Sequence, residues 1–291
     1  MPKHLNEKFA RWAQAPTQVA IEQTERAERV VAEAVHAAAA LRGRDVRVFL
    51  HGSHRNRTSI SGIAVDAGVA YYSPPADDAR DSAAARSAAA PYPYAQFKDE
   101  IGVALVARFG ASAVQRTDKV FRVRADANVA IHVAPFFEHR QHIRGSRHAT
   151  GVVLHPDGGV PPQVVNWPDQ HFANGQAKDD ATDGRYRATV RVLKHLRNEM
   201  RENAVPSAQR ISGYLIECLA WNVPNSKFGG DTHYHDLREC LVYVFNETKS
   251  DDLCAKWREV NRVENLFPGH AWTRQDAQDF VVAAWHYVGY Q

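Results

Sequence analysis

The sequence predicts an α+β protein in which a mixed β-sheet comes first and a bundle of helices follows. Apolar residues recur at helical spacing near the N-terminus, short runs rich in β-branched residues come next, and only helical spacing is found after residue 168. A chain of 291 residues, 44% hydrophobic and 24% charged, can bury one large core or two smaller ones. We therefore expect a sheet-bearing domain over residues 1–168 and a helical domain over residues 169–291.

One long helix is expected over residues 17–41. Ala, Glu and Arg, which favour helices, fill much of this segment. Gly43 and Asp45 then break the pattern. The apolar residues at helical spacing are Val19, Ala27, Val31, Ala34, Ala38 and Leu41.

The strands are predicted from short apolar runs that favour β structure over helix. Pro156, Asp157, Gly158 and Gly159 separate the last two runs, which indicates a hairpin. The expected strands cover residues 46–50, 63–72, 120–123, 129–133, 152–154 and 164–165.

Helical spacing also occurs between and after the strands. Residues 94–109 are expected to form a helix, and residues 73–95, rich in Pro, Ala, Asp and Ser, to form an exposed insertion that interrupts the sheet. The expected C-terminal helices cover residues 182–201, 212–221, 235–245 and 274–287.

The bulk composition limits the class of protein. A formal net charge of +3 does not by itself predict a nucleic-acid binder. Cys218, Cys240 and Cys254 lie far apart and form no CxxC motif, which argues against a zinc site or a disulfide framework and fits a reducing, cytoplasmic setting. No signal-peptide core and no run of membrane-spanning length is found, so no membrane partner is expected.

The feature that points to chemistry is residues 51–58, His-Gly-Ser-His-Arg-Asn-Arg-Thr, at the end of the first expected strand. A glycine at position 52 lets backbone N–H groups approach phosphate oxygens, and the Ser53 hydroxyl adds a donor. Arg55 and Arg57 make the turn basic. A Gly-Ser pair also occurs in plain turns, but the acidic strand that follows favours a phosphate-binding loop.

Carboxylates are expected near such a loop if it serves phosphoryl transfer, because they hold the metal ions that neutralise developing charge. Asp66 lies on the second expected strand, and the position that shares its face two residues earlier is Ala64. On a later strand the position expected beside this pair is Ala130, with His132 on the same face. A lone Asp also fits a structural role, such as pairing with an Arg, and we expect His132 to be a half-buried polar residue rather than a metal ligand.

A basic stripe is predicted on the helix at residues 182–201. Arg187, Arg191 and Lys194 fall at positions i, i+4 and i+7 and so share one face. Such a stripe could face a triphosphate, but a solvated basic surface would show the same pattern.

Together these motifs resemble the bacterial cGAS/DncV-like nucleotidyltransferases (CD-NTases), which are related to the oligoadenylate synthetases within the polymerase-β-like superfamily. The resemblance spans roughly residues 17–288 by the order and spacing of motifs. The residues that carry it are 51–58, Val65 and Asp66, 131–138, Lys178, Thr182, Arg191, Lys194 and 212–217, Ser-Gly-Tyr-Leu-Ile-Glu.

The resemblance implies a polymerase-β-like core with a long N-terminal spine helix, and a C-terminal helical bundle that closes a nucleotide cleft. It implies an enzyme that uses Mg²⁺, or Mn²⁺ in its place, to join nucleoside triphosphates, ATP among them, into a cyclic or linear oligonucleotide with release of pyrophosphate. In bacteria such a product usually activates an effector in anti-phage defence. The activator, the bases and the linkage are not fixed by the sequence.

The resemblance also implies roles by position. Gly52 and Ser53 would contact the triphosphate, and the metal-binding catalytic carboxylates would fall at positions 64, 66 and 130. The other expected nucleotide-binding residues are Arg191 and Lys194 near the phosphates, Ser212 beside them, and Tyr214 stacked on a base.

Two of the three expected carboxylates are therefore alanine, at Ala64 and Ala130. The chain is expected to be inactive as it stands, because a single carboxylate holds Mg²⁺ weakly. One explanation is a natural nucleotide-binding protein without turnover, and the other is the deliberate inactivation of an enzyme. We favour the second, because the phosphate loop and the basic helix persist while both changes are minimal truncations.

Two other functions remain open at this stage. One is a sensor or regulatory protein that uses the same cleft without catalysis. The other is a nucleotidyltransferase that acts on RNA or protein, against which the modest net charge argues.

Glu217 and the six tryptophans are given structural roles. Glu217 is expected to be the partner of an Arg in a buried pair rather than a catalytic group. The tryptophans are expected to pack in the core or at a domain junction rather than to stack on bases. They are Trp12, Trp167, Trp221, Trp257, Trp272 and Trp285.

Overall fold

The computed structural model describes residues 3–60, 64–72, 92–126, 129–143, 147–269 and 271–291. It divides into two compact units. One, called here the sheet unit, comprises Gln18–His51 and Ser61–Trp167. The other, the helical unit, comprises Met1–Thr17, Gly52–Ile60 and Pro168–Gln291. None of the helices in the described ranges is both long and apolar enough to cross a membrane.

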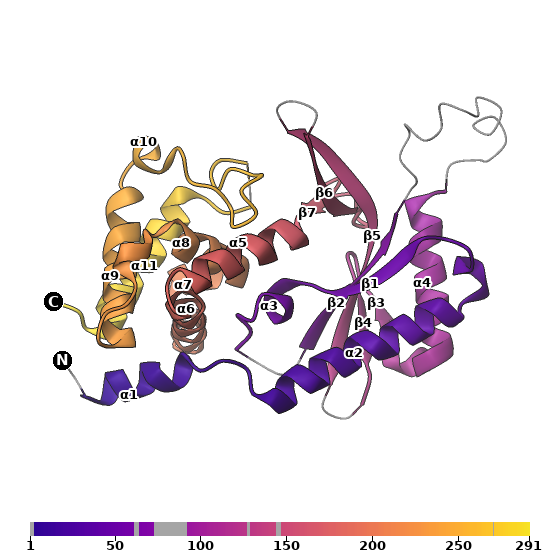
Figure 1. Ribbon diagram of the computed structural model, residues 1–291, viewed down its shortest axis with the longest axis horizontal. Helices are drawn as coiled ribbons and strands as arrows, with labels where there is room; N and C mark the ends of the chain where they lie inside the picture. The colour runs from indigo at the N-terminus through magenta and orange to yellow at the C-terminus, as the bar shows by residue number, and fades with distance from the viewer. Residues whose placement is uncertain (1–2, 61–63, 73–91, 127–128, 144–146, 270) are drawn as a thin grey trace. The chain divides into compact units, whose positions relative to one another are not determined.

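The sheet unit is built on a mixed seven-stranded sheet (Figure 1). Its main path runs in the order β1-β2-β5-β4-β3, and β6 and β7 continue from β5. The pairing of β2 with β5 is parallel, and the other strand pairs are antiparallel. The strands are β1 (Val46–Leu50), β2 (Ala64–Tyr71), β3 (Val114–Arg116), β4 (Phe121–Arg124), β5 (Ala130–Ile143), β6 (Arg147–Leu154) and β7 (Val164–Asn166).

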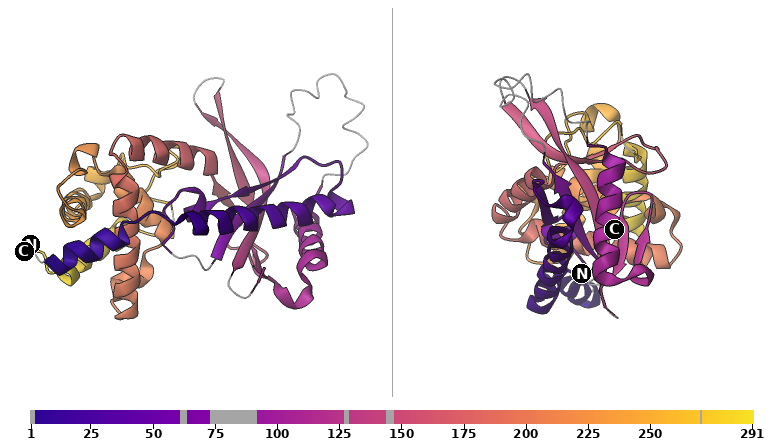
Figure 2. Two further views of the ribbon diagram at one scale, coloured as in Figure 1. Left: turned by 60° about the horizontal axis from the view of Figure 1, so that its bottom comes forward. Right: turned by 90° about the vertical axis from the view of Figure 1, so that its right-hand side faces the viewer.

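Two helices, α2 (Gln18–Ala37) and α4 (Tyr94–Phe109), cover one face of this sheet (Figure 2). Side chains alternate between the two faces of a strand, so the odd-numbered residues of β2 and β5 point toward these helices. Their burial against the helices forms the main hydrophobic core of the unit. The core includes Val31, Val35, Val65, Val69, Phe97, Ile101, Leu105, Ile131 and Val133.

The opposite face of the sheet carries a smaller apolar cluster around Phe136 and Ala134. Gly68 lies on this face under the ring of Phe49, and a Cβ atom there would come within 2.6 Å of Phe49 Cζ. The glycine therefore allows the close approach of an aromatic ring next to the strand position of Asp66.

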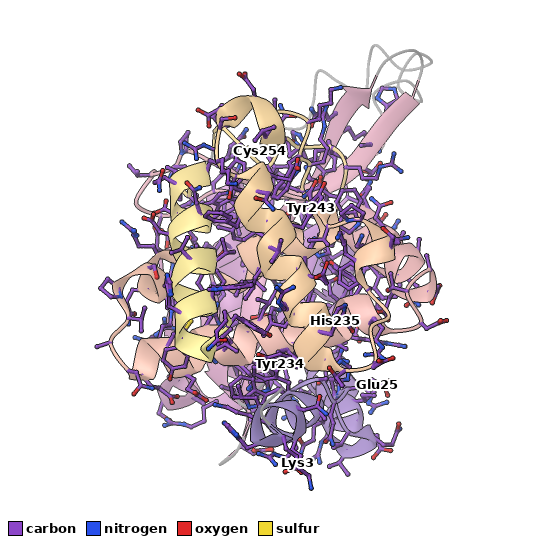
Figure 3. The ribbon with its side chains drawn as sticks, turned by 90° about the vertical axis from the view of Figure 1, so that its left-hand side faces the viewer. Lys3, Glu25, Tyr234, His235, Tyr243 and Cys254 are labelled. Atoms are coloured by element: carbon purple, nitrogen blue, oxygen red, sulfur yellow. The ribbon has the colours of Figure 1, made fainter. Side chains whose placement is uncertain are left out.

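The helical unit packs its helices around a separate core. Figure 3 shows α9 with Tyr234, His235 and Tyr243 labelled along it. Tyr234 stacks on Phe9 at 6.1 Å between ring centroids, which ties the first helix to this unit. The longer helices are α1 (Lys3–Trp12), α5 (Pro168–Asp180), α6 (Arg185–Glu202), α8 (Gly213–Asn222), α9 (His233–Glu247) and α11 (Arg274–Val288), with short helices α3 (Gly52–Arg55), α7 (Pro206–Arg210) and α10 (Asp251–Cys254).

The predicted α+β class is confirmed, and the expected long helix, the first strand and the helix at residues 94–109 are found at or within a few residues of their expected ends. The expected hairpin is also confirmed, because β6 and β7 pair antiparallel through Val153 and Val165. Residues 73–91 of the expected insertion, residue 63 and residues 127–128 of the expected turn lie outside the described residues.

Several elements differ from the expectation. Helices α1 and α5 and strand β3 were not predicted, and β5 runs well past the expected end at residue 133. The polar turn expected at Gly52 is a short helix. The units also divide the chain in a different way from a single cut at residue 168, because Met1–Thr17 and Gly52–Ile60 pack with the C-terminal helices.

Candidate functional site

The three positions expected to hold metal lie together on two neighbouring strands of the sheet unit. In the parallel pairing of β2 with β5, Ala64 is opposite Ala130 and Asp66 is opposite His132. Paired residues on adjacent strands point to the same face. The four side chains therefore form one patch, on the face of the sheet that α2 and α4 do not cover.

Asp66 is half-buried and has a specific partner in this patch. His132 Nδ1 lies 3.3 Å from Asp66 Oδ1, and the two side chains are 36% and 31% exposed. The expectation that His132 is half-buried is thus confirmed. Pairing with an arginine is the structural role named above for Asp66, but the side chain beside it is the imidazole of His132.

Two arginines extend the same face onto the next strand. Strand β4 pairs antiparallel with β5 so that Arg122 is opposite His132 and Arg124 is opposite Ala130. Both arginines are exposed, and Arg124 donates a hydrogen bond to the Ser112 carbonyl. With alanines at positions 64 and 130, this face carries more positive than negative charge, which favours an anionic ligand over a cation.

The donor set of the patch does not fit a pair of Mg²⁺ ions. Magnesium requires oxygen ligands in octahedral geometry, and carboxylates supply them in phosphoryl-transfer sites. Here Asp66 is accompanied by two alanines and an imidazole, which is a poor Mg²⁺ ligand. Over the described ranges, no group of three or more His, Cys, Asp or Glu side chains could hold a metal ion.

Gly52 and Ser53 lie in the helical unit, where they begin the short helix α3. Gly52 has a φ of 62°, a left-handed conformation that glycine adopts without strain. The Ser53 carbonyl accepts hydrogen bonds from the backbone N–H groups of Thr58 at 2.9 Å and Ser59 at 3.1 Å. The segment is therefore a closed loop rather than an open turn.

Lys194 and Glu217 meet in a buried cluster of the helical unit. Lys194 Nζ donates to Glu217 Oε1 at 2.5 Å and to the carbonyl and hydroxyl oxygens of Thr58, both at 3.1 Å. These contacts use all three donors of the ammonium group. Glu217 is buried as expected, but its partner is a lysine and not the expected arginine.

Two further groups complete the cluster around Glu217. His171 Nε2 lies 2.8 Å from Glu217 Oε2, and Asn56 Nδ2 donates to the same oxygen at 3.2 Å. Because an ionised carboxylate only accepts, His171 carries its proton on Nε2. Burial raises the pKa of Glu217, but the Lys194 charge and the His171 hydrogen bond lower it more, so its pKa lies below the ordinary value.

The basic stripe of α6 is not a solvated surface, so that alternative is wrong. Arg187, Arg191 and Lys194 are 4%, 6% and 4% exposed. Arg191 donates to the backbone carbonyls of Ala13 and Arg57, and Arg187 pairs with Asp179. The stripe therefore joins α1, the loop after Gly52 and α5 to α6.

Ser212 and Tyr214 lie at the start of α8. The Ser212 hydroxyl accepts from the Leu215 backbone N–H at 3.0 Å, which is an N-cap. Tyr214 is half-buried, donates to Glu259 Oε2 at 2.6 Å and packs its ring against His171 and Trp272. Burial raises the pKa of Tyr214, and Cys218 and Glu259 raise it further, so the phenol stays protonated at neutral pH. Gly213 lies between them, and a Cβ there would be 3.4 Å from Lys194 Cε.

The predicted packing role of the tryptophans is confirmed. Trp167 and Trp257 are buried, and the ring of Trp257 stacks on Tyr243. The other four pack against the core of the helical unit. Lys178, quoted for the resemblance, donates to the Val223 carbonyl, and burial lowers its pKa to about 8.

Sequence reasoning missed three members of the Glu217 cluster. Asn56 and Thr58 stand within the loop motif, at positions where polar residues look like ordinary turn residues. His171 lies on α5, a helix with no clear amphipathic pattern in the sequence. Their shared partner becomes visible only when α5, α6, α8 and the loop are brought together.

Comparison with known proteins gives relatives along the whole chain. The profile of the cGAS/DncV-like nucleotidyltransferase C-terminal helical domain matches residues 173–289. The cyclic dipyrimidine nucleotide synthase CdnE of Legionella pneumophila is 31% identical over 290 residues, which cover 96% of each chain. The cyclic dipurine nucleotide synthase of Elizabethkingia meningoseptica is 31% identical over 265 residues, covering 86% of this chain and 87% of the relative.

Solved structures of cyclic nucleotide synthases are also similar to this chain. The Elizabethkingia meningoseptica CdnE cyclic dinucleotide synthase, determined with GTP and Apcpp, matches with a TM-score of 0.80 at 27% identity and covers 98% of this chain and 99% of its own. The Rhodothermus marinus CdnE c-UMP-AMP synthase has the same fold, with a TM-score of 0.81 at 24% identity over 98% of this chain and 97% of its own. A relative of this identity over nearly the full length, together with the matching helical domain, shows that the chain belongs to the cGAS/DncV-like nucleotidyltransferases, the CD-NTases.

Proposed function

We propose that this chain has the scaffold of a cyclic dinucleotide synthase, and that the sequence as it stands binds nucleoside triphosphates without joining them. Its full-length relatives are named as cyclic nucleotide synthases, which supports the reaction class. The observation that carries the rest of the proposal is the patch on β2 and β5, where Ala64 and Ala130 accompany Asp66.

The assigned roles follow from the chemistry of each group. Gly52 and Ser53 offer backbone and hydroxyl donors to a triphosphate, and Arg191 and Lys194 supply positive charge in the same unit. Ser212 and Tyr214 are assigned to the neighbourhood of the phosphates and to the base. Mg²⁺, with Mn²⁺ as the alternative, is the cofactor of the carboxylate-complete form and does not fit the present residues.

The proposal includes the nucleotide substrates and the biological role of the product. The Legionella pneumophila and Cecembia lonarensis relatives are named cyclic dipyrimidine nucleotide synthases, so UTP and CTP stand beside ATP as candidate substrates. The product would be a second messenger that activates an effector in anti-phage defence. The protein would act in the cytoplasm.

Restoring the missing carboxylates tests the proposal. We expect the double variant Ala64→Asp/Ala130→Asp to release pyrophosphate from a mixture of the four ribonucleoside triphosphates in Mg²⁺, while the unchanged chain stays at background. Labelled products treated with nuclease P1 and phosphatase distinguish cyclic from linear linkages. A folded double variant that stays silent with every nucleotide mixture, with and without candidate activators, would count against the enzyme.

The positive charge of the patch favours a second candidate, a natural sensor that binds nucleotide without turnover. Arg122 and Arg124 would attract the triphosphate where carboxylates and metal are lacking. Binding of ATP in excess EDTA, lost in the Arg122→Gln/Arg124→Gln variant, would support the sensor. Codons for Asp at positions 64 and 130 in the encoding gene would instead show that the alanines were introduced.

A further inference from the structure

The segment that carries Gly52 and Ser53 is held to the helical unit at three consecutive residues. The Asn56 side chain bonds to Glu217, the Arg57 carbonyl accepts from Arg191 Nη1 at 2.8 Å, and Thr58 bonds to both Glu217 and Lys194. No element of the sheet unit is needed for these bonds. The conformation of the loop is therefore set by α6 and α8.

Glu217 is the group on which these contacts converge. Its two oxygens receive four donors: Thr58 Oγ1 at 2.6 Å and Lys194 Nζ at 2.5 Å on one oxygen, and His171 Nε2 and Asn56 Nδ2 on the other. The side chain is 3% exposed, so water does not replace a lost partner. A carboxylate is required because every neighbour donates and one of them is a cation.

The loop itself needs such a restraint. Arg57 has a φ of 58°, in the left-handed region that a residue with a side chain seldom adopts. Such a conformation persists only where the surroundings determine it. Its neighbours on both sides, Asn56 and Thr58, are the two loop residues that bond to Glu217.

We propose that Glu217 is a positioning residue, which fixes residues 52–58 in the conformation that binds the triphosphate. This proposal rests on the proposed function, because it takes the loop after Gly52 as the phosphate site. Glu217 itself would touch no nucleotide. It would act through Thr58 and Asn56, whose backbone continues the ring closed on the Ser53 carbonyl.

Two readouts distinguish positioning from general stability. The first is the affinity for inorganic tripolyphosphate by calorimetry at a temperature where each variant is fully folded. The second is amide hydrogen exchange at Asn56, Thr58 and Ser59, whose N–H groups close the loop on Gly52 and Ser53. The second readout requires no ligand, so it tests the inference even if the proposed function fails.

The variants are Glu217→Gln, Thr58→Val and a matched control, Asp236→Asn. Asp236 is 0% exposed, pairs with Arg185 at 2.9 Å and accepts from the Gly229 and Gly230 N–H groups, so it is a comparable buried carboxylate of the same unit. Thr58→Val removes a hydroxyl with little change of shape, and it serves as the milder variant if Glu217→Gln does not fold.

We expect Glu217→Gln and Thr58→Val to weaken tripolyphosphate binding by roughly tenfold or more, the equivalent of one hydrogen bond to a charged group, and to speed exchange of the loop amides by a similar factor. Asp236→Asn should lower the melting temperature and leave both readouts unchanged. Equal loop exchange in all three variants would overturn the positioning role. A different result is that the loop amides exchange faster in Glu217→Gln and Thr58→Val, as expected, but the unchanged chain does not bind tripolyphosphate. This result would overturn the proposed phosphate site and leave the positioning of the loop established.

Discussion

The sheet unit and the helical unit preserve the expected machinery to different degrees. On the sheet, positions 64 and 130 are alanines, and Asp66 is left beside His132 and a strand that bears two arginines. In the helical unit, Lys194 and Glu217 are buried with their bonding capacity filled. The residues that would hold metal are missing while those that shape the loop are complete.

This contrast separates two requirements of phosphoryl transfer. Turnover depends on metal ions that neutralise developing charge, and in the proposed function alanines stand at two of the three positions that would hold these ions. Binding a polyphosphate depends on a preorganised set of donors, which the loop after Gly52 would supply under the proposed function, while the cations of α6 hold that loop in place. A chain altered only on the sheet would therefore lose catalysis before it loses its ligand.

The strongest way to sharpen the contrast is to rebuild the patch at alternative positions. A carboxylate at position 132 would lie opposite Asp66 and would also remove the imidazole that contacts it. We expect Ala64→Asp/Ala130→Asp, with the third carboxylate at its proposed position, to turn over nucleotides on the order of a thousandfold faster than either Ala64→Asp/His132→Asp or Ala64→Asp alone, because metal ions supply several kcal/mol of transition-state stabilisation.

Pyrophosphate release at saturating Mg²⁺ measures the effect. The suitable control is Ala64→Asp with His132→Asn, which removes the imidazole without adding a charge. If the variant with Asp at position 132 is the faster one, the third metal-binding position is 132 rather than 130, and the proposed site is wrong.

Much of this contrast was open to prediction from the sequence. The strand before Gly52, the acidic strand and the basic stripe all have short-range patterns, and the two alanines stand out because their neighbours keep the pattern. The pairing of Asp66 with His132 and the convergence of His171, Asn56 and Thr58 on Glu217 depend on register and on helix packing. Single-chain periodicity carries no information on either.

The first helix shows the same limit. Phe9 and Trp12 lie on α1, which packs against the core of the helical unit although the whole sheet unit intervenes in the sequence. The segment is short and polar, so its helical stability comes from tertiary packing rather than from propensity.

A second prediction concerns the pH dependence of the helical unit. The pKa of Glu217 is lowered in the folded protein, so the unfolded chain takes up its proton first as the pH falls. The stabilisation by ionised Glu217 is therefore complete above its ordinary pKa of 4.5 and is lost progressively below it. We expect Glu217→Gln to be less stable than the unchanged chain by about 3 kcal/mol at pH 7, the cost of breaking a buried pair.

Urea unfolding at pH 7 and at pH 4 measures this difference, which should shrink at the lower pH. The same pair of measurements on Lys194→Met tests the other partner, because it leaves the Glu217 carboxylate buried without its cation. A difference between Glu217→Gln and the unchanged chain that stays constant over this range would mean that the carboxylate is not the titrating group.

The smallest expected effect decides whether Ser212 belongs to the phosphate site or only to the fold. Its hydroxyl caps α8 through the Leu215 N–H, just as Thr273 caps α11 (Arg274–Val288) through the Asp276 N–H. Loss of either cap should cost about 1 kcal/mol in the free energy of unfolding. We expect Ser212→Ala to weaken tripolyphosphate binding in addition, whereas Thr273→Ala should not.

Calorimetric titration of Ser212→Ala and Thr273→Ala with tripolyphosphate at one temperature separates phosphate binding from helix capping, because both variants lose a similar amount of stability. If both variants bind tripolyphosphate like the unchanged chain, Ser212 acts only as a helix cap. The phosphate-binding donors of the helical unit would then be confined to the loop after Gly52, and α8 would contribute to binding only by holding that loop through the carboxylate of Glu217.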